Sequence, residues 1–301
     1  IGPPSDRALT LANEVAAAVN RENGPARFVG MYAYNDHSPP PSLQAHPRVL
    51  INAATAFIKG GKRIEDIISG WSEKGAAIGI REYYSVHPWD RDMPGVARGA
   101  RLDYLGSTIS DFHRRGARFL TSEASDNWGC NGLGYYFASR VLWNTNAANQ
   151  KAEIVDDFLT LAFGPAKEPM RKFYETIDGD NPRARLILDD QLGRMFRSLQ
   201  KARRMADSKE IRARIDDLTL YARYVELFDR YRSAQGEARK AAFESVVRHA
   251  WRMRRTQMVH TLALYRDVPA RDKAAAPPEN ARWNVPPGKN PWKIEQPFRP
   301  S

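Results

Sequence analysis

Apolar and polar residues follow two alternating patterns in the first half of this chain. Short apolar runs rich in β-branched and aromatic residues alternate with stretches in which apolar residues recur every three or four positions. The short runs predict strands over Phe28–Tyr34, Val49–Phe57, Ala77–Tyr84 and Arg118–Glu123. The longer stretches predict a first helix capped by Ser5-Asp6, then helices over Ile64–Lys74, Leu102–Arg115 and Leu133–Asn144. Apolar strands separated by helices indicate a parallel sheet covered on its faces.

The second half of the chain has a helical pattern throughout. It predicts helices over Ile154–Phe163, Pro169–Ile177, Leu186–Met205, Ile211–Tyr231 and Ala238–Tyr265. Leu218, Tyr221, Ala222, Val225 and Phe228 form one apolar stripe, which is typical of a helical bundle. The last stretch, 269–301, holds eight prolines and predicts an extended tail. We therefore divide the chain into 1–148, 149–268 and 269–301.

Four parallel strands fit either half of a (β/α)8 barrel or a small doubly wound sheet. No glycine-rich phosphate loop follows any of the strands. Polar and aromatic residues gather at the carboxyl ends of the strands, where barrel enzymes build their active sites. The sequence therefore favours an α/β fold, a partial TIM barrel followed by an all-α region and a proline-rich tail.

Two strands end in a glutamate, and these glutamates are the main candidates for chemistry. Glu82 and Glu123 are each followed by a loop with aromatic and polar residues. Carboxylates beside aromatic rings are typical of sugar sites, and glycosidic hydrolysis uses two carboxylates. We expect Glu82 and Glu123 to share one site as catalytic residues. The alternative for each is a structural carboxylate that pairs with Arg81 or Arg118 or caps a loop.

Further residues near the predicted strand ends are candidates for binding sugar. They are Tyr34, Asn35, Asp36, His37, Tyr83, Tyr84, Trp89, Asp126, Asn127 and Trp128. Asn35, Asp36 and His37 could hold a metal together with His46, but this spacing is common by chance and we predict no metal and no cofactor. Trp89 could equally fold into the core. Cys130 has no base beside it in the sequence and fits a small buried hydrophobe.

Charge is unevenly distributed along the chain. Of its 46 Lys and Arg and 35 Asp and Glu, 30 and 21 lie in residues 149–301. The cations fall between apolar helix positions with acids among them, so they predict solvated helix faces and no nucleic-acid partner. No run is long enough to span a membrane. The chain begins with Ile1 and enters a helix at once, and we expect it to be part of a longer protein.

An ordered set of motifs resembles a known family. The motifs are Ser5-Asp6, Leu11 to Ala16, Met31 to Tyr34, Tyr83-Tyr84, Gly134 to Tyr136, Leu142 to Asn144, Asp157-Phe158 and Ala162 to Ala166. Together they resemble a bacterial domain-of-unknown-function family over about residues 5–180. That family is grouped with the TIM-barrel glycoside hydrolases, near α-glucuronidases and β-N-acetylhexosaminidases.

The resemblance implies that the four strands are the fifth to eighth of a barrel. Glu82 would then end the seventh strand, as a nucleophile does in many retaining glycosidases, and Glu123 would bind a sugar hydroxyl at the eighth. It also implies export to the periplasm or outside the cell, and a general acid in a missing amino-terminal half of the barrel. We expect a glycoside-hydrolase-like protein acting on a complex polysaccharide. One alternative is a non-catalytic carbohydrate-binding protein on the same fold, and a second is a scaffold whose basic helical half binds an anionic polymer.

Overall fold

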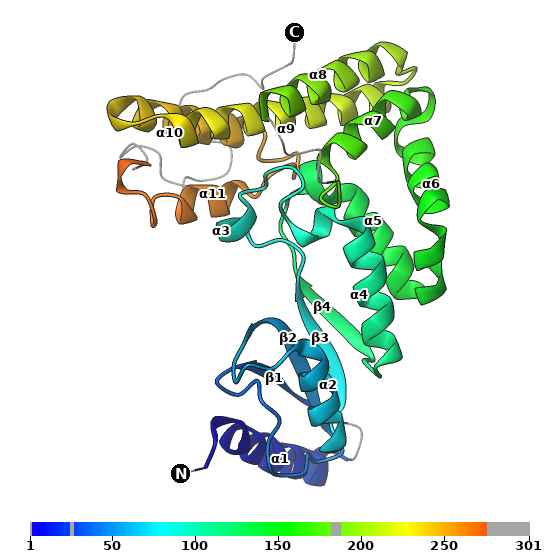
Figure 1. Cartoon of the computed structure of the whole chain (residues 1–301), viewed down its shortest axis with the longest axis vertical. Helices are drawn as coiled ribbons and strands as arrows, with labels where there is room; N and C mark the ends of the chain where they lie inside the picture. The colour runs from blue at the N-terminus through cyan, green and yellow to red at the C-terminus, as the bar shows by residue number, and fades with distance from the viewer. Residues whose placement is uncertain (1, 25–26, 182–187, 276–301) are drawn as a thin grey trace. The chain divides into compact units, whose positions relative to one another are not determined.

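The computed structural model describes residues 2–24, 27–181 and 188–275. These residues form a mixed α/β structure with a four-stranded parallel sheet and many helices (Figure 1). The chain divides into two compact units. Unit 1 spans Ile1–Tyr84 and Ser107–Glu123, and unit 2 spans Ser85–Gly106 and Ala124–Ser301. The predicted boundaries at 148 and 268 remain predictions about domains that fold independently.

Unit 1 contains the sheet. The strands are β1 (Val29–Asn35), β2 (Val49–Ile58), β3 (Ala77–Tyr83) and β4 (Phe119–Glu123), in the order β1-β2-β3-β4. Every neighbouring pair is parallel. The prediction of four adjacent parallel strands in chain order is therefore confirmed, with each boundary within about a residue of its predicted place.

One face of this sheet carries the core of unit 1. It packs against α1 (Pro4–Asn23), α2 (Ile64–Glu73) and α4 (Leu102–Arg114). Successive strand residues alternate between faces, so Ile51, Ala53, Ile78 and Ile80 all point to this helix-covered side. The first helix begins at Pro4, so Ser5 and Asp6 lie inside it and do not cap it. The Asp6 carboxylate instead accepts hydrogen bonds from Ser42 N and Oγ at 2.7 and 2.6 Å.

Unit 2 is helical. It contains α3 (His87–Asp90), α5 (Trp128–Trp143), α6 (Lys151–Phe163), α7 (Lys167–Ile177), α8 (Leu188–Met205), α9 (Lys209–Ser233), α10 (Gly236–Arg252) and α11 (Thr261–Asp267). Short 3-10 turns lie at Arg98–Ala100, Thr145–Gln150, Gly164–Ala166 and Lys273–Ala275. Of the predicted tail, residues 276–301 lie outside the described residues.

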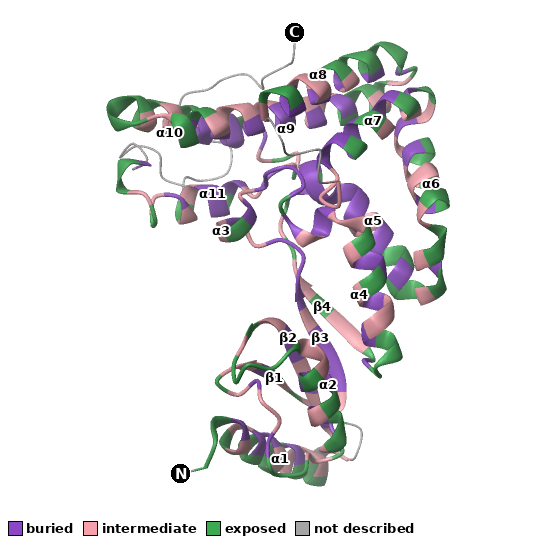
Figure 2. Ribbon diagram, viewed as in Figure 1, coloured by how far each residue is buried: buried purple, intermediate pink, exposed green. Residues whose placement is uncertain are grey.

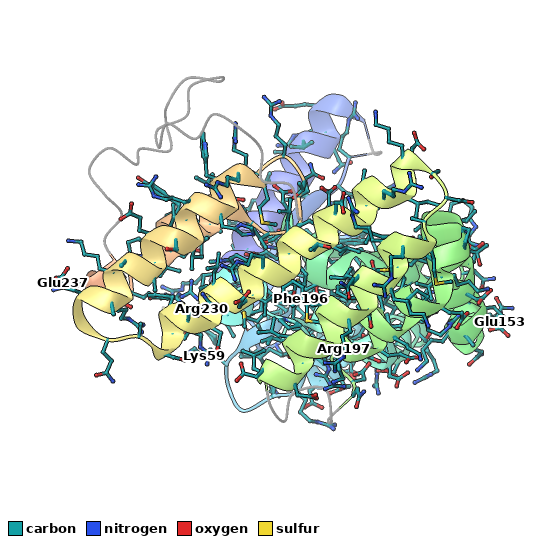
Figure 3. All side chains as sticks on the ribbon, turned by 90° about the horizontal axis from the view of Figure 1, so that it is seen from above. Lys59, Glu153, Phe196, Arg197, Arg230 and Glu237 are labelled. Atoms are coloured by element: carbon teal, nitrogen blue, oxygen red, sulfur yellow. The ribbon has the colours of Figure 1, made fainter. Side chains whose placement is uncertain are left out.

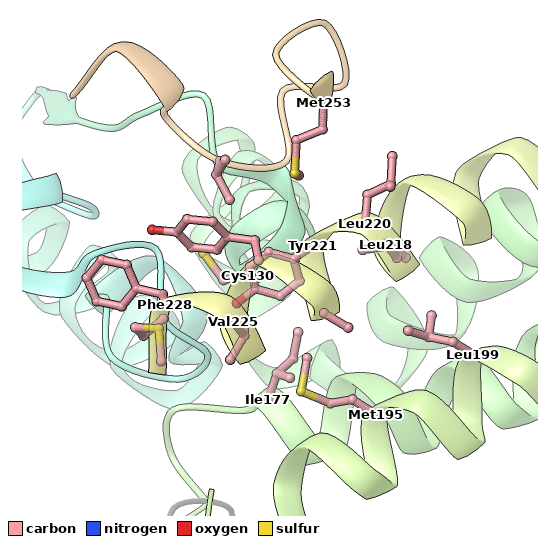
Figure 4. Close-up of a cluster of buried hydrophobic side chains, with 14 of the residues drawn as sticks. Cys130, Ile177, Met195, Leu199, Leu218, Leu220, Tyr221, Val225, Phe228 and Met253 are labelled. Carbon is pink, nitrogen blue, oxygen red and sulfur yellow. The ribbon is translucent and has the colours of Figure 1, made fainter. Parts of the chain in front are cut away.

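The core of unit 2 is formed by side chains of the long helices. Leu218, Tyr221, Val225 and Phe228 of α9 pack in it as the apolar stripe predicts, together with Leu199 of α8 (Figure 4). The helices α6, α8 and α10 each have a buried and an exposed face (Figure 2). Charged side chains lie on the outside of α6, α8, α9 and α10, among them Glu153, Arg197, Arg230 and Glu237 (Figure 3). The prediction of solvated basic faces around an apolar bundle is confirmed.

Two helix predictions were wrong at their ends. The helix predicted from Leu133 begins five residues earlier, at Trp128. The single helix predicted over Ala238–Tyr265 is two helices, separated by residues 253–260. The two errors have one cause: the carbonyls of Gln257 and Met258 accept from Trp128 N and Gly129 N, at 2.9 and 3.2 Å. The break in the later helix thereby satisfies the free N–H groups at the start of α5.

Candidate functional site

The register of β3 and β4 separates the two candidate glutamates. Glu82 is level with Ser122, whereas Glu123 is level with Tyr83. Residues that are level on neighbouring strands point to the same face, and successive residues point to opposite faces. Glu82 and Glu123 therefore lie on opposite faces of the sheet. The structure does not bring them into one shared site, contrary to our expectation.

Glu82 lies on the helix-covered face. Its side chain is fully buried, and its Oε1 accepts hydrogen bonds from the Thr55 hydroxyl and from Tyr83 N, the latter at 3.1 Å. Thr55 reaches it because Ala54 is level with Arg81, which places Thr55 level with Glu82. A buried carboxylate needs such donors to offset the loss of water. Glu82 therefore has a structural environment, with Thr55 and the Tyr83 amide as its partners and not Arg81 or Arg118.

The opposite face of the sheet, here called the open face, carries Tyr32, Tyr34, Arg81, Tyr83 and Glu123. None of these residues belongs to the core cluster of unit 1. Tyr32 is 47% exposed. Further towards the amino ends, Phe119 lies over Gly79, where an added Cβ would come within 2.1 Å of the Phe119 ring. The glycine thus allows an aromatic ring to lie flat on this face.

Three aromatic rings form a row across the carboxyl ends of β1, β2 and β3. The centroid of the Phe57 ring lies 5.6 Å from that of Tyr34 and 6.3 Å from that of Tyr83, both in edge-to-face geometry. Phe57 has a backbone φ of 59°, in the left-handed region that is strained for a side chain of this size. This conformation occurs beside an irregular register between β1 and β2, and the Phe57 side chain is 51% exposed. We call Tyr34, Phe57 and Tyr83 the aromatic row.

An ion pair flanks the aromatic row. Arg81 Nη2 donates to Glu123 Oε2 at 3.0 Å, and the Arg81 guanidinium lies 5.4 Å from the centre of the Tyr83 ring. Burial raises the pKa of Tyr83, and the neighbouring Tyr34 adds to this rise, whereas Arg81 lowers it. The Glu123 side chain remains 44% exposed. A carboxylate, a guanidinium and two tyrosine side chains thus lie together on one face.

The polar residues that follow β1 form a turn at its end. The carbonyl of Asn35 accepts from Ser38 N at 3.0 Å and from Ser38 Oγ at 2.6 Å, and His37 N donates to the Tyr34 carbonyl at 3.2 Å. Asp36 is exposed. Within residues 2–24, 27–181 and 188–275, no group of three or more His, Cys, Asp or Glu side chains could hold a metal ion.

The remaining candidates, apart from Tyr84, belong to unit 2. Among them, Asn127 lies in a network of hydrogen bonds within that unit. It is fully buried, and its Nδ2 donates to Ser85 Oγ at 2.5 Å and to Asp92 Oδ1 at 2.8 Å. Its Oδ1 accepts from the Tyr135 hydroxyl at 2.6 Å. These bonds use the polar atoms of the amide. The interpretation of Asn127 as a sugar-binding residue therefore loses support.

Its neighbours differ in exposure. Asp126 is exposed, Trp89 is 48% exposed on α3, and Trp128 is 44% exposed with its ring 5.5 Å from that of Tyr135. Tyr84 of unit 1 is buried. Cys130 is buried in the core of unit 2, as expected, and burial raises the pKa of its thiol. The sugar-binding role of the exposed residues remains a prediction.

Sequence reasoning missed Phe57, because the apolar pattern predicts it as the last residue of an ordinary strand and no turn residue marks its unusual backbone. The Arg81–Glu123 ion pair is the structural alternative stated for Glu123. The separation of Glu82 from Glu123 had no signal in the sequence. Only the register shows that Glu123 is level with Tyr83 and not with Glu82. No helix among the described residues is long and apolar enough to cross a membrane.

Comparisons with known proteins identify a family and no individual relative. No curated protein and no solved structure matches the chain. The model of one family, described as a domain of unknown function (DUF4838), matches residues 2–176, more than half of the chain. The match includes the whole sheet and the helices up to α7. The chain therefore belongs to the DUF4838 family.

Proposed function

We propose that the open face of the sheet binds carbohydrate. The observation that carries the proposal is the aromatic row, three rings across three neighbouring strands beside the Arg81–Glu123 ion pair. Aromatic rings stack on the C–H faces of sugars, and a few fixed polar groups provide orientation. The exposed Phe57 ring would supply stacking surface. Glu123 and Arg81 would bind hydroxyl or acidic groups.

We also propose that the four strands are half of a (β/α)8 barrel. In such a barrel the helices cover the outside, and alternate strand residues point inward. The helix-covered face of this sheet would then be the outside and the open face the interior. Support comes from the parallel order of the strands and from the polar residues on the open face, among them Asn52, Arg81, Thr121 and Glu123.

Sugar binding is better supported than hydrolysis by the described residues. Hydrolysis requires two carboxylates that are about 5–5.5 Å apart for retention or about 6.5–9.5 Å apart for inversion. Glu82 points to the other face and cannot supply the second group beside Glu123. Hydrolysis is the second candidate, because the Glu123 carboxylate is exposed at the end of the row. It would need a carboxylate from another part of the full protein.

Titration with oligosaccharides tests the binding proposal. We would titrate the chain with chito-oligosaccharides and with oligogalacturonides by calorimetry, and compare Phe57→Ala with Phe28→Ala. Phe28 is 50% exposed, similar to Phe57, but precedes β1 at the amino end of the sheet. We expect Phe57→Ala to weaken binding about tenfold, because one stacking contact contributes on the order of 1 kcal/mol.

Phe28→Ala should leave the affinity unchanged. Absence of binding to both sugar classes, or equal losses in the two variants, would contradict the proposal. Release of reducing ends measured in the same samples addresses hydrolysis. We expect none from this chain, and turnover that disappears in Glu123→Gln would favour the second candidate.

A further inference from the structure

A basic pocket lies between α7 and α8 of unit 2. Its volume is about 490 Å³, which is in the range of pockets that bind small molecules. Lys172 and Thr176 of α7 line one side, and Arg194, Arg197, Ser198 and Lys201 of α8 line the other. Both helices belong to unit 2, so the pocket is formed within one compact unit. It is unrelated to the open face of the sheet.

The cations on α8 form one row along the helix. Arg194, Arg197 and Lys201 are three and four residues apart, and side chains at this spacing are neighbours on a helix surface. Like charges at such positions repel one another and destabilise the helix by a few tenths of a kcal/mol per pair. Lys172 of the facing helix adds a fourth cation to the same pocket. Glu175 is the one acidic residue in its lining.

Most of these cations lack an acidic partner. Arg194 pairs with Asp190, with Nε and Oδ2 2.9 Å apart. Lys172, Arg197 and Lys201 form no ion pair with any residue that the structure describes. Elsewhere on these helices Arg171 pairs with Asp156 and Arg203 pairs with Asp216, whereas Arg204 forms no ion pair with a described residue. Three cations without an acidic partner therefore lie together in the pocket lining.

Neutral donors accompany the cations. The Ser198 hydroxyl lines the pocket and makes no hydrogen bond within the described part of the chain. The Thr176 hydroxyl, in contrast, already donates to the Lys172 carbonyl at 2.7 Å. A guanidinium, two ammonium groups and a free hydroxyl are the groups that bind phosphate, sulfate and carboxylate oxygens. These groups favour an anionic ligand over a neutral apolar one.

We propose that this pocket binds a small anion carrying two or more negative groups. Arg197 would make a two-point contact with one of these groups, Lys172 and Lys201 would bind the others, and Ser198 would donate its hydroxyl. Binding would also remove the repulsion along α8. Phosphate and carboxylate groups share this chemistry, so the probes must distinguish them.

The test uses pyrophosphate and citrate as probes at constant ionic strength. Calorimetric titration of the whole chain would compare Arg197→Gln with Arg204→Gln. Both residues are exposed on α8 and both changes remove one positive charge, but Arg204 does not line the pocket. We expect Arg197→Gln to weaken binding of the preferred probe about tenfold, and Arg204→Gln to change it less than about twofold.

Ser198→Ala separates a defined site from a general positive field. It leaves the charge unchanged, and we expect a loss of about threefold to tenfold in affinity because one hydrogen bond to a charged ligand disappears. A stronger effect on pyrophosphate identifies a phosphate-type ligand, and a stronger effect on citrate a carboxylate. Equal losses in Arg197→Gln and Arg204→Gln, or no binding of either probe at millimolar concentration, would overturn the proposal.

Discussion

The carboxylate of Glu82 is buried and accepts hydrogen bonds that stabilise it there. Thr55 and the Tyr83 amide donate to it, and hydrogen bonds to a charged acceptor each contribute about 1.5–3 kcal/mol. We therefore expect Glu82→Ala to lower the free energy of unfolding of unit 1 by about 3 kcal/mol. Urea unfolding followed by circular dichroism would measure this loss of free energy.

Glu123→Ala is the comparison, since its partly exposed ion pair should contribute less than about 1 kcal/mol. A larger loss for Glu123→Ala than for Glu82→Ala would show that Glu82 is not the structural carboxylate.

Asn127 and Asp126 are adjacent, but the structure gives them different environments. The Asn127 side chain makes buried hydrogen bonds to Ser85 and Asp92 and a partly buried one with Tyr135, whereas Asp126 is exposed. Removing the Asn127 amide leaves buried groups without a partner, which costs about 1–3 kcal/mol for each group. We expect Asn127→Ala to destabilise unit 2 by at least about 2 kcal/mol. Asp126→Ala should stay within about 0.5 kcal/mol, as surface changes usually do. Thermal unfolding would measure both, and equal effects would contradict the buried network.

At the scale of elements, sequence periodicity was a good guide to strands and a weaker one to helix ends. Strand identity follows from local apolar patterns, and short connections leave few alternatives for the strand order. The break between α10 and α11 could not be predicted in this way, because its cause is a contact with the start of α5, more than a hundred residues earlier. Gln257 also has a left-handed backbone conformation, with a φ of 56°. Because this residue is not a glycine, the sequence gives no sign of that conformation.

The candidate site shows the same limit. Chain order predicts which residues stand at the ends of strands, and Tyr34, Tyr83 and Glu123 do stand there. The face to which each side chain points depends on register and on the irregularity beside Phe57. A shift of one residue moves a side chain to the opposite face. For this reason the sequence could group Glu82 with Glu123 while the sheet separates them.

The contact between α9 and α10 predicts a dependence of stability on pH. His249 of α10 is buried, and its Nε2–H donates to the Leu220 carbonyl of α9 at 2.8 Å. Burial lowers the pKa of His249 from 6.5 to about 4. The unfolded chain therefore binds a proton at a pH where the folded chain does not. The stabilising contribution is complete above pH 6.5 and is lost as the pH falls from 6.5 towards 4, by about 3 kcal/mol in total.

A variant isolates this contribution. His249→Gln can keep a donor near Leu220 but has no group that titrates. We expect it to lose about 3 kcal/mol less stability than the original chain between pH 7 and pH 4, measured by urea unfolding at each pH. His87, whose pKa is lowered by burial to about 3, changes stability in the same direction. It is present in both proteins and cancels in the comparison. Identical pH profiles would show that His249 is not buried in its neutral form.

At the scale of the whole molecule, two separate cores determine how the chain unfolds. The core of unit 1 and the core of unit 2 have no residue in common. Ile67 is fully buried in the first, and Phe228 is 3% exposed in the second. Replacing a buried isoleucine or phenylalanine by alanine costs about 2–5 kcal/mol, because contacts are lost and a cavity remains. Each change should therefore affect the unit in which it lies.

Calorimetry should resolve this as two unfolding transitions. We expect Ile67→Ala to lower the midpoint of one transition by several degrees and Phe228→Ala to lower the midpoint of the other. In the double variant the two losses should add to within about 0.5 kcal/mol, as they do for sites without shared contacts. The chain passes between the units three times, and α4 has residues in both. A single transition that both changes lower equally would show that the two cores unfold as one cooperative structure, because separate units cannot respond to a cavity in the other.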